Sequence, residues 1–399
     1  MSTAILVINA GSSSLKFAAY GDDDSLPRMA RGEISGLGTN PRIAVSGRGI
    51  KSVDEALSAT TGGTEALTHV LRWMAEQFPG VTVAAIGNRI VHGGMQYHAP
   101  VVLDERVLAD LETLDPLAPQ HQPFNLAAAR TLHARFPQAL SIGCFDTAFH
   151  ADWSDAARRI PLPRRFHDAG VRRYGFHGLS YEYLTGRMRM LAPCARRVVL
   201  AHLGSGASIC ATENGRSIAS TMGFSTIDGL PMATRCGGID PGVIFHLRRQ
   251  FGMSSDEIER LLYNESGLKG VSGISADMRA LLASSRFEAK QAIDVFVHHC
   301  VAAIGSMAAL LGGMDALVFS GGIGAYAASI RAAICDRLAY FGVELDYTRN
   351  TVDDERISLD FSRVPIFALA TDEEFVIARH CRSLLARESV PSPAQACHS

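Results

Sequence analysis

The feature that most constrains the fold is an apolar strand that runs into a Gly-Ser turn and returns as a second strand, because this unit occurs twice. The first copy spans Ile5–Phe17, with a Gly11–Ser14 turn and Lys16 on the returning strand. The second copy spans Val198–Ile209 and turns at Gly204-Ser205-Gly206. Such an internal repeat predicts two similar β-rich lobes rather than one continuous core.

Both turns have the chemistry of an anion-binding site. Glycine lets backbone N–H groups approach an anion, serine hydroxyls add donors, and Lys16 adds a positive charge. The glycine spacing matches neither the strand-to-helix loop of dinucleotide folds nor a Walker-type loop. Either turn alone is more often an ordinary hairpin connector. Their recurrence favours phosphate binding, with both turns at one nucleotide in a cleft between facing lobes.

The length of 399 residues also predicts two lobes. We place the first at residues 1–148 plus 371–399 and the second at residues 149–370. Each hairpin is followed by helices and further strands. The expected helices cover residues 64–78, 125–136, 287–311 and 371–385; the later expected strands cover residues 83–91, 139–145 and 316–320, and residues 321–324 are read as a turn.

Composition and charge argue against several classes of partner. The formal net charge is -2 and Lys and Arg form no long runs, which argues against nucleic acid and anionic membranes. No uninterrupted apolar stretch reaches about 18 residues, and the amino terminus lacks the pattern of a signal peptide. The eight cysteines form no CxxC pair and read as reduced thiols, so we expect a cytoplasmic protein without a structural zinc site.

Four residues beside glycines or at strand ends are candidates for catalysis. Arg89 and Arg235 carry guanidinium groups, which hold carboxylates and phosphates in a bidentate fork. Taken singly, each is more often a surface ion-pair partner, but the glycines beside both leave room for a small substrate. Asp146 directly follows an apolar strand and either lines a cleft or caps a turn. His177 lies between glycine and aromatic residues, a setting also typical of a structural histidine.

Weaker signals lie further along the chain. Asp277-Met278-Arg279 and Gly322-Ile323-Gly324 suit a ribose and an adenine that packs against backbone. Glu373, in the first turn of the closing helix, reads either as a magnesium contact or as a carboxylate favoured by the helix dipole.

Taken together, these segments resemble the acetokinase family, a branch of the acetate and sugar kinase, Hsp70 and actin superfamily. The resemblance covers nearly the whole chain in the order typical of the family. The matching segments are Val7–Phe17, Arg89–Gly94, Phe145–His150, Tyr174–Gly178, His202–Gly204, Gly229–Met232, Asp240–Gly242, Ser275–Arg279 and Asp372–Glu374.

The resemblance implies an α/β fold of two duplicated actin/Hsp70-like (ribonuclease H-like) lobes with a central cleft. It also implies a homodimeric phosphotransferase with a carboxyl group as acceptor, which converts ATP and acetate into ADP and acetyl phosphate with Mg²⁺ (or Mn²⁺). A carboxylate is already a nucleophile at neutral pH, so catalysis would depend on alignment and charge neutralisation rather than on a general base.

The resemblance also assigns roles to residues. Arg89 would bind the substrate carboxylate, Arg235 and His177 would stabilise the transferring phosphoryl group, and Asp146 would orient rather than abstract a proton. The metal would lie near Asn9 and Glu373. The nucleotide-binding residues would be Lys16, His202, Leu203, Gly204, Ser205, Gly206, Asp277, Met278, Arg279, Gly322, Ile323, Gly324, Ala325 and Tyr326.

Several positions depart from the family pattern. Ser205 and Gly238 replace Asn and Asp, and Ala325-Tyr326 replaces Glu-Asn, so nucleotide preference is open. Gln120 and Thr226 replace apolar residues, which favours a more polar acyl pocket. The alternatives are therefore a propionate or other short-chain carboxylate kinase, a non-catalytic nucleotide-dependent homologue, and a binding module of the Hsp70 or actin type.

Overall fold

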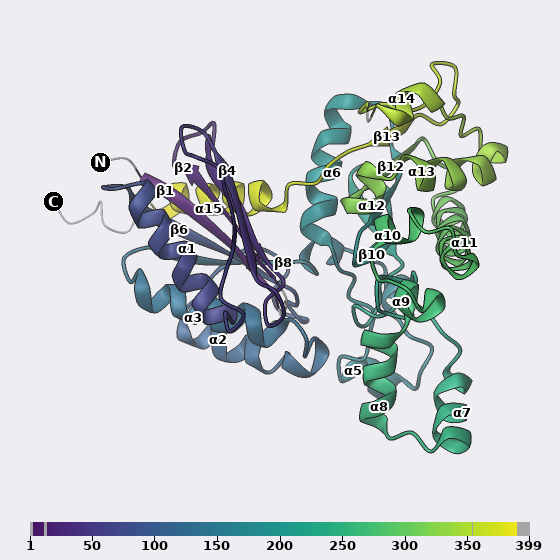
Figure 1. Ribbon diagram of the computed structural model, residues 1–399, viewed down its shortest axis with the longest axis horizontal. Helices are drawn as coiled ribbons and strands as arrows, with labels where there is room; N and C mark the ends of the chain where they lie inside the picture. Colours follow the sequence, from purple (N-terminus) through teal and green to yellow (C-terminus); the bar gives the residue numbers. More distant parts are fainter. Residues whose placement is uncertain (1–2, 12–13, 353, 389–399) are drawn as a thin grey trace. The chain divides into compact units, whose positions relative to one another are not determined.

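The computed structural model describes residues 3–11, 14–352 and 354–388 (Figure 1). Its contacts divide the chain into two compact units, Met1–Ala148 with Asp372–Ser399 and Phe149–Thr371. Ser12 and Ser13 of the first predicted turn lie outside the described residues.

The first unit contains an eight-stranded sheet with the order β5-β4-β3-β2-β1-β6-β8-β7. Its strands are β1 (Thr3–Ala10), β2 (Ser14–Gly21), β3 (Arg28–Ser35), β4 (Arg42–Gly47), β5 (Val53–Ala56), β6 (Thr82–Ile90), β7 (Val101–Val102) and β8 (Leu140–Phe145). Its helices are α1 (Gly63–Gln77), α2 (Glu105–Glu112), α3 (Gln122–Arg135) and α15 (Glu373–Glu388).

Pairing in this sheet brings three polar positions to one edge. The hairpin strands β1 and β2 are antiparallel, while β6 runs parallel to β1 and β8 runs parallel to β6. The carboxyl ends of β1, β6 and β8 therefore lie at the same edge. Asn9 lies near the end of β1, Arg89 lies near the end of β6, and Asp146 directly follows β8.

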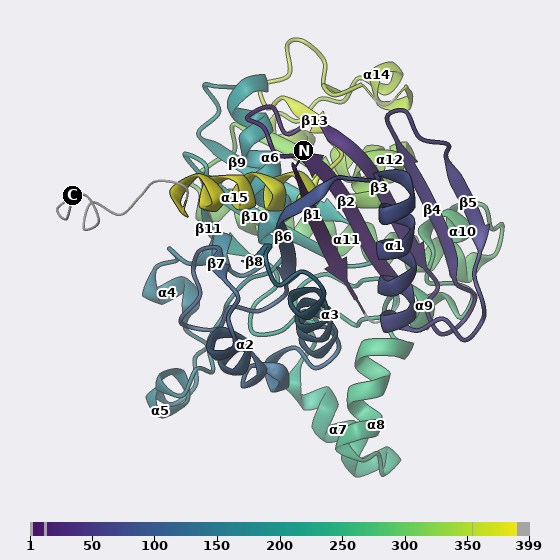
Figure 2. The same cartoon turned by 90° about the vertical axis from the view of Figure 1, so that its left-hand side faces the viewer.

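Helices cover both faces of this sheet (Figures 1 and 2). On one face, α1 and α3 bury an apolar cluster in which Trp73 packs edge-on against Phe17 at 5.8 Å between ring centroids. On the other face, α15 contacts β1 and β6. Gly87 permits this approach, because a Cβ there would lie 2.2 Å from Cγ2 of Ile377. A larger residue at position 87 would push α15 off the sheet.

The second unit repeats the same strand scheme. Its sheet has the order β11-β10-β9-β12-β13, with β9 (Arg197–Leu203), β10 (Ala207–Glu213), β11 (Arg216–Ser220), β12 (Ala316–Ser320) and β13 (Ile366–Ala368). The hairpin β9–β10 is antiparallel, and β12 lies parallel to β9 on its other side. This order reproduces β3-β2-β1-β6-β8 of the first unit, so the predicted duplication of a ribonuclease H-like lobe is confirmed.

Helices also cover the second sheet. One face packs on α6 (Gly178–Leu191), and the long helix α11 (Phe287–Leu310) contacts β9, β10 and β11. The remaining helices are α4 (Asp155–Arg158), α5 (Arg164–Asp168), α7 (Pro241–Phe251), α8 (Ser255–Arg260), α9 (Gly267–Ser272), α10 (Met278–Leu282), α12 (Gly321–Tyr326), α13 (Ala328–Cys335) and α14 (Tyr347–Thr351).

Helix α11 is long and apolar enough, by length and composition alone, to cross a membrane. Its buried residues recur at three- and four-residue spacing, from Ala289 and Phe296 to Ile304 and Ala308, as expected for a helix packed on one face. The core helix of a water-soluble protein passes the same length and composition test.

One local prediction is wrong, and one predicted helix begins earlier than expected. The Gly-Gly-Ile-Gly segment is the start of helix α12 and not a turn. Glycine has a low helix propensity, so the sequence pattern did not indicate a helix here. The carbonyls of Gly324 and Ala325 near the end of this helix accept hydrogen bonds from Arg331, which helps to stabilise it. Helix α3 begins at Gln122 rather than at residue 125, because Pro123 is compatible with a first helical turn.

The cysteines of the described chain are all free thiols. Five of them are buried, namely Cys144, Cys210, Cys300, Cys335 and Cys381, whereas Cys194 is exposed and Cys236 is half-buried. Reduced thiols are what the sequence predicts; Cys397 lies outside the described residues.

Candidate functional site

Arg89 and Asp146 form an ion pair at the strand ends of the first unit. Nη2 of Arg89 donates to Oδ2 of Asp146 at 2.5 Å, and Nε donates to Oδ1 at 3.2 Å. The Asp146 side chain is 2 % exposed and that of Arg89 is 16 % exposed. This bidentate geometry is the strong form of an arginine–carboxylate contact, so the two side chains orient each other.

The other predicted residues of this unit gather around the pair. Oδ1 of Asn9 accepts a hydrogen bond from Nη1 of Arg89 at 3.3 Å. Lys16 lies opposite Asn9 in the β1–β2 register. Glu373 is the first residue of α15 and interacts electrostatically with Asp146, Arg89 and Lys16. The structure therefore brings Asn9, Lys16, Arg89, Asp146 and Glu373 together.

Two pKa values reflect the charge density of this cluster. Burial by itself would lower the pKa of Arg89, but the charge of Asp146 and its hydrogen bonds raise it above the ordinary arginine value. Loss of solvation and the neighbouring Asp146 charge raise the pKa of Glu373 to about 7, against the opposing effect of Arg89. Arg89 is thus fully charged, while the carboxylate form of Glu373 is disfavoured unless more positive charge is present.

The donor atoms of the cluster suit a hard divalent cation. The side-chain oxygen atoms of Asn9, Asp146 and Glu373 are ligands of the kind such a cation prefers. Burial and the neighbouring Asp146 charge raise the pKa of Glu373, and a cation would offset the effect of that charge. Among the described residues there is no group of three or more His, Cys, Asp or Glu side chains able to hold a metal ion by themselves. Magnesium is typically held by one or two carboxylates with phosphate oxygens and water, and this limited protein ligand set fits it.

Two buried amides that sequence reasoning missed support the loop after Arg89. Oδ1 of Asn125 accepts from the Val91 N–H at 2.9 Å, and its Nδ2 donates to the carbonyl of Ala10. Gln122 exchanges two hydrogen bonds with the backbone of His92. Both amides lie at the start of α3. The sequence feature that could have revealed them is a pair of polar residues three positions apart, which lie on the buried face of the helix.

His177 of the second unit has a strained backbone and a fixed side chain. Its φ of 58° lies in the left-handed region, which is uncommon for a residue other than glycine and often marks functional sites. Nδ1 of the ring lies 2.8 Å from Oγ of Ser208, and the carbonyl accepts from the Tyr181 N–H at 3.1 Å. His177 is the N-cap of α6, so this helix sets its position.

The second predicted histidine lies against the first. The rings of His177 and His202 stack with 4.4 Å between centroids and an interplanar angle of 23°. Nδ1 of His202 lies 2.8 Å from Oγ of Ser180, which is buried in the first turn of α6. Ser180 therefore contacts the imidazole of His202 directly. Its neighbour Tyr181 contacts the imidazole of His177 through Ser208.

Gly206 separates these rings from Arg235. A Cβ at Gly206 would lie 3.3 Å from Nε2 of His177 and 3.9 Å from Nη1 of Arg235. The absence of a side chain leaves space beside both donors. The backbone carbonyl of Ser205 accepts from the Ala233 N–H at 3.2 Å, which connects the turn to the segment that carries Arg235. The structure therefore brings His177, His202, the Gly204–Gly206 turn and Arg235 together.

The predicted nucleoside residues are only partly connected to this group. The start of α12 lies beside the turn, since a Cβ at Gly204 would lie 3.7 Å from the Gly322 N atom. Asp277 instead caps α10 and pairs with Arg279 at 2.8 Å. Among the described residues, no hydrogen bond joins Asp277, Met278 or Arg279 to the Gly204–Gly206 turn.

Arg331 is a third residue that the sequence analysis missed. It is fully buried and donates to the carbonyls of Gly324 and Ala325, while Nε and Nη2 bind the side chain and backbone of Asn350. These contacts hold the carboxyl end of α12, where Tyr326 is 66 % exposed. In the sequence, Arg331 is an arginine within an apolar helical segment. Many arginines with a purely structural role have the same surroundings, so the pattern does not single it out.

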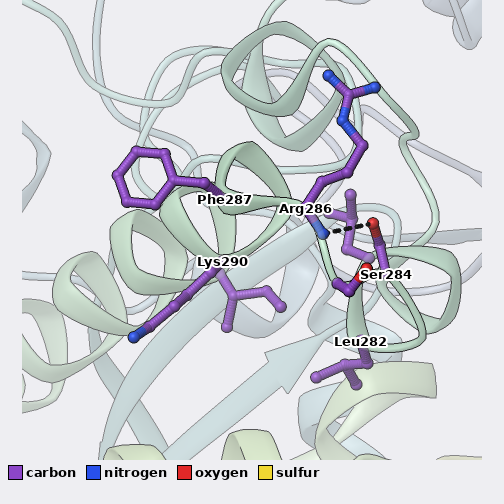
Figure 3. Close-up of a pocket in the computed structure, with 8 residues that line it drawn as sticks. Leu282, Ser284, Arg286, Phe287 and Lys290 are labelled. Atoms are coloured by element: carbon purple, nitrogen blue, oxygen red, sulfur yellow. Dashed lines mark hydrogen bonds between the residues drawn. The ribbon is translucent and has the colours of Figure 1, made fainter.

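A surface pocket of about 460 Å³ lies between α10 and the start of α11 (Figure 3). Leu282, Ser284, Arg286, Phe287 and Lys290 line it, and Oγ of Ser284 accepts from the Arg286 N–H at 3.3 Å. None of the predicted site residues lines this pocket.

Comparison with known proteins identifies close relatives. The profile of the acetokinase family matches residues 4–379. An acetate kinase of Methylocella silvestris is 46% identical over 398 residues, covering 96% of this chain and 98% of that protein. An acetate kinase of Rhizobium meliloti is 45% identical over 388 residues, covering 96% and 98%.

Solved structures agree with these sequence relatives. A propionate kinase from Francisella tularensis superimposes with a TM-score of 0.88 at 32% identity, covering 95% of this chain and 98% of that one. An acetate kinase from Porphyromonas gingivalis superimposes with a TM-score of 0.85 at 30% identity, covering 96% and 100%.

His150 anchors the loop that leads to His177. Its Nε2 donates to the carbonyl of Phe176 at 2.9 Å, so Nδ1 of the neutral ring accepts from Oγ of Ser217 at 2.7 Å. Ser217 also accepts from Nε1 of Trp153 at 2.8 Å. Burial lowers the pKa of His150 to about 4, against the opposing effect of its bond to Phe176. The native state therefore requires the neutral ring.

We predict that acid destabilises the second unit through His150. Because the folded pKa lies below the unfolded value of about 6.5, stability is full above that pH and falls as the pH drops toward 4. The shift corresponds to a loss of about 2 kcal/mol at pH 5. Urea unfolding at pH 7.5 and pH 5 measures it, in a Trp73→Phe background where Trp153 reports the second unit.

The comparison variants are His150→Asn and His246→Gln, which replace a buried and an exposed histidine. We expect His150→Asn to lower stability at pH 7.5 and to flatten its pH dependence, and His246→Gln to leave both unchanged. An unchanged pH dependence in His150→Asn would contradict the assignment.

Proposed function

Since the chain belongs to the acetokinase family, we propose that it is an acetate kinase, which transfers the γ-phosphoryl group of ATP to acetate and yields acetyl phosphate and ADP. The observation that carries the proposal is the Arg89–Asp146 ion pair beside Asn9, Lys16 and Glu373. A nucleotide-driven binding module would also use metal and phosphate contacts such as Asn9, Glu373 and Lys16, but it has no chemical need for the Arg89–Asp146 pair that would bind a substrate carboxylate.

The reaction we propose is a direct displacement. A carboxylate oxygen of acetate bonds to the γ-phosphorus while the bond from that phosphorus to the β–γ bridging oxygen breaks, and ADP leaves with the electron pair. No proton has to be removed from the nucleophile. Asp146 therefore serves to orient Arg89, whose remaining N–H donors bind the substrate carboxylate. The rate gain comes from alignment and from neutralised charge.

Asn9, Asp146 and Glu373 would hold Mg²⁺, with Mn²⁺ as a substitute. The bound cation would neutralise phosphate oxygens of ATP, and it would favour the carboxylate form of Glu373. Lys16 adds a further positive charge on the returning strand of the first hairpin.

The second unit supplies donors for the phosphoryl group and the nucleotide. His177 and Arg235 flank the space left by Gly206, and the backbone of the Gly204–Gly206 turn is the candidate phosphate contact. Gly322, Ile323 and Gly324 at the start of α12, with Ala325, Tyr326, Asp277, Met278 and Arg279, are the candidate nucleoside contacts. Ser205, in place of Asn, still provides its backbone and a hydroxyl.

We also propose that the protein is a cytoplasmic homodimer. The second unit exposes large apolar side chains on two helices, at Val243, Phe245 and Phe251 of α7 and at Phe287 and Leu310 of α11. Exposed apolar area of this kind is commonly buried between subunits.

Formation of acyl phosphate tests the proposed activity. Hydroxylamine trapping with ATP, Mg²⁺ and acetate should give a hydroxamate, with kcat/KM compared for acetate, propionate and a hydroxy acid. We expect acetate to be used best. Higher kcat/KM for propionate or the hydroxy acid would identify another short-chain carboxylate kinase. Absence of product with every acid, from folded protein, would refute the proposal.

Asp146→Asn should lower kcat/KM in this assay by about 10²-fold or more, because the amide keeps the shape of the side chain but loses the charge that fixes Arg89. Asp54→Asn is the control, since Asp54 pairs with Arg42 on the exposed surface of the same unit. An equal effect of the two substitutions would contradict the role of Asp146.

Removal of the Arg235 side chain tests the phosphoryl contact in the second unit. We expect Arg235→Ala to lower kcat by about 10²-fold or more, as loss of one preorganised donor to a transition state does. Arg260→Ala is the control, because Arg260 is 64% exposed and pairs with Glu265. A change confined to KM would assign Arg235 to ground-state binding instead.

The dimer is tested by light scattering coupled to size-exclusion chromatography. We expect a mass of twice 42.8 kDa at micromolar concentration. Phe245→Glu combined with Phe251→Glu should shift the mass toward that of a single chain if α7 contributes to the interface. A wild-type mass of 42.8 kDa would refute the proposal.

A further inference from the structure

The second unit contains a buried chain of hydroxyl groups that leads to His177. The phenol oxygen of Tyr181 lies 2.5 Å from Oγ of Ser208, and Oγ of Ser208 lies 2.8 Å from Nδ1 of His177. Tyr181 and Ser208 are both fully buried. Water is thus excluded from the chain, and each hydrogen atom must find its acceptor within the protein.

Two directions of donation are possible along this chain. In the first, Tyr181 donates to Ser208 and Ser208 donates to Nδ1 of His177, so the imidazole hydrogen lies on Nε2. In the second, Nδ1 of His177 donates to Ser208, Ser208 donates to Tyr181, and Tyr181 must donate elsewhere. The position of the imidazole hydrogen therefore depends on where the Tyr181 hydrogen goes.

The surroundings of Tyr181 favour the first direction. Burial raises the pKa of Tyr181 well above its ordinary value, so its hydroxyl is protonated and can donate. The other hydroxyl that acts on the phenol is that of Ser220, which also lowers the Tyr181 pKa. Among the described residues, Ser208 is the hydrogen-bond partner of the Tyr181 hydroxyl, and buried Oγ of Ser220 has no partner beyond its effect on the phenol. In the second direction the Tyr181 hydrogen could go only toward Ser220, and the hydrogen of Ser220 itself would then have no acceptor. Such a loss costs about 1–3 kcal/mol. In the first direction Ser220 is free to donate toward the phenol oxygen, and no buried hydrogen is left over.

We infer that Tyr181 and Ser208 are positioning residues that hold His177 as the neutral tautomer with its hydrogen on Nε2. That nitrogen is the one beside Gly206, 3.3 Å from where a Cβ would lie. The inference rests on the proposed function, in which His177 donates a hydrogen bond to an oxygen of the transferring phosphoryl group. In the other tautomer, Nε2 would present a lone pair to that oxygen and repel it.

Tyr181 also controls the backbone of His177. Its N–H donates to the His177 carbonyl at 3.1 Å, and this bond forms the first turn of α6 while His177 keeps its left-handed φ of 58°. One residue therefore acts on the backbone directly and on the ring through Ser208. This double contact explains how a strained residue is held with its Nε2 toward the glycine turn.

The tautomer is measurable without any assay of activity. Nitrogen NMR of protein labelled in histidine, at neutral pH and without substrates, distinguishes a ring nitrogen that carries hydrogen from one that does not, and His177→Gln identifies the signal. We expect hydrogen on Nε2 of His177. Hydrogen on Nδ1 would overturn the inference, whether or not the protein makes acetyl phosphate.

Two substitutions test the chain itself. Ser208→Ala and Tyr181→Phe should populate the Nδ1–H tautomer and lower kcat by about 10-fold, with KM for ATP and acetate changed by less than about twofold. Tyr97→Phe is the control, because it removes a part-buried phenol that donates to Asp110 in the first unit. An unchanged tautomer and an unchanged kcat in both variants would refute the role of the hydroxyl groups. If the variants do not fold, the NMR measurement on the wild-type protein tests the inference by itself.

Discussion

The ion pair between Arg89 and Asp146 is the interaction on which the first unit's site depends. Removing one partner from a buried pair typically costs about 3–5 kcal/mol, because the other charge stays behind in a poorly solvated place. Parallel pairing of β6 with β8 brings the two residues together, and pairing of β6 with β1 adds Asn9. The charges at this end of the sheet therefore depend on one another. Burial and the Asp146 charge disfavour a second negative charge on Glu373, and a bound cation would relieve that repulsion. This is the physical reason that the cluster suits a cation.

The second unit organises its site differently, through one helical turn and a glycine. Ser180 and Tyr181 begin α6 and control the stacked rings of His202 and His177, while Gly206 keeps space beside Nε2 and Arg235. The two rings and the guanidinium of Arg235 bond to hydroxyl and backbone groups, which fix them in place. Rigidly held donors suit a phosphoryl group, whose charge spreads over several oxygens during transfer.

The local pattern of apolar and turn-forming residues was sufficient to predict many of the strands and helices. The two hairpins carry alternating or continuous apolar residues around Gly-Ser turns, and the structure has strands at both places. Pattern was misleading at Gly321–Gly324, where contacts with Arg331 and not propensity stabilise a helix. It was also uninformative for Asn125, because its partners Ala10 and Val91 are distant in sequence.

The sequence by itself determined which segments form strands and helices, the duplication of the lobe, and the residue types available at the strand ends. These properties depend on neighbours a few residues away, so they are visible in a linear pattern. Only the tertiary structure decided which candidates meet: Arg89 with Asp146, Tyr181 through Ser208 with His177, and Asp277 with its own helix instead of the Gly204–Gly206 turn. Those contacts depend on strand register and helix placement, which join residues far apart in the chain.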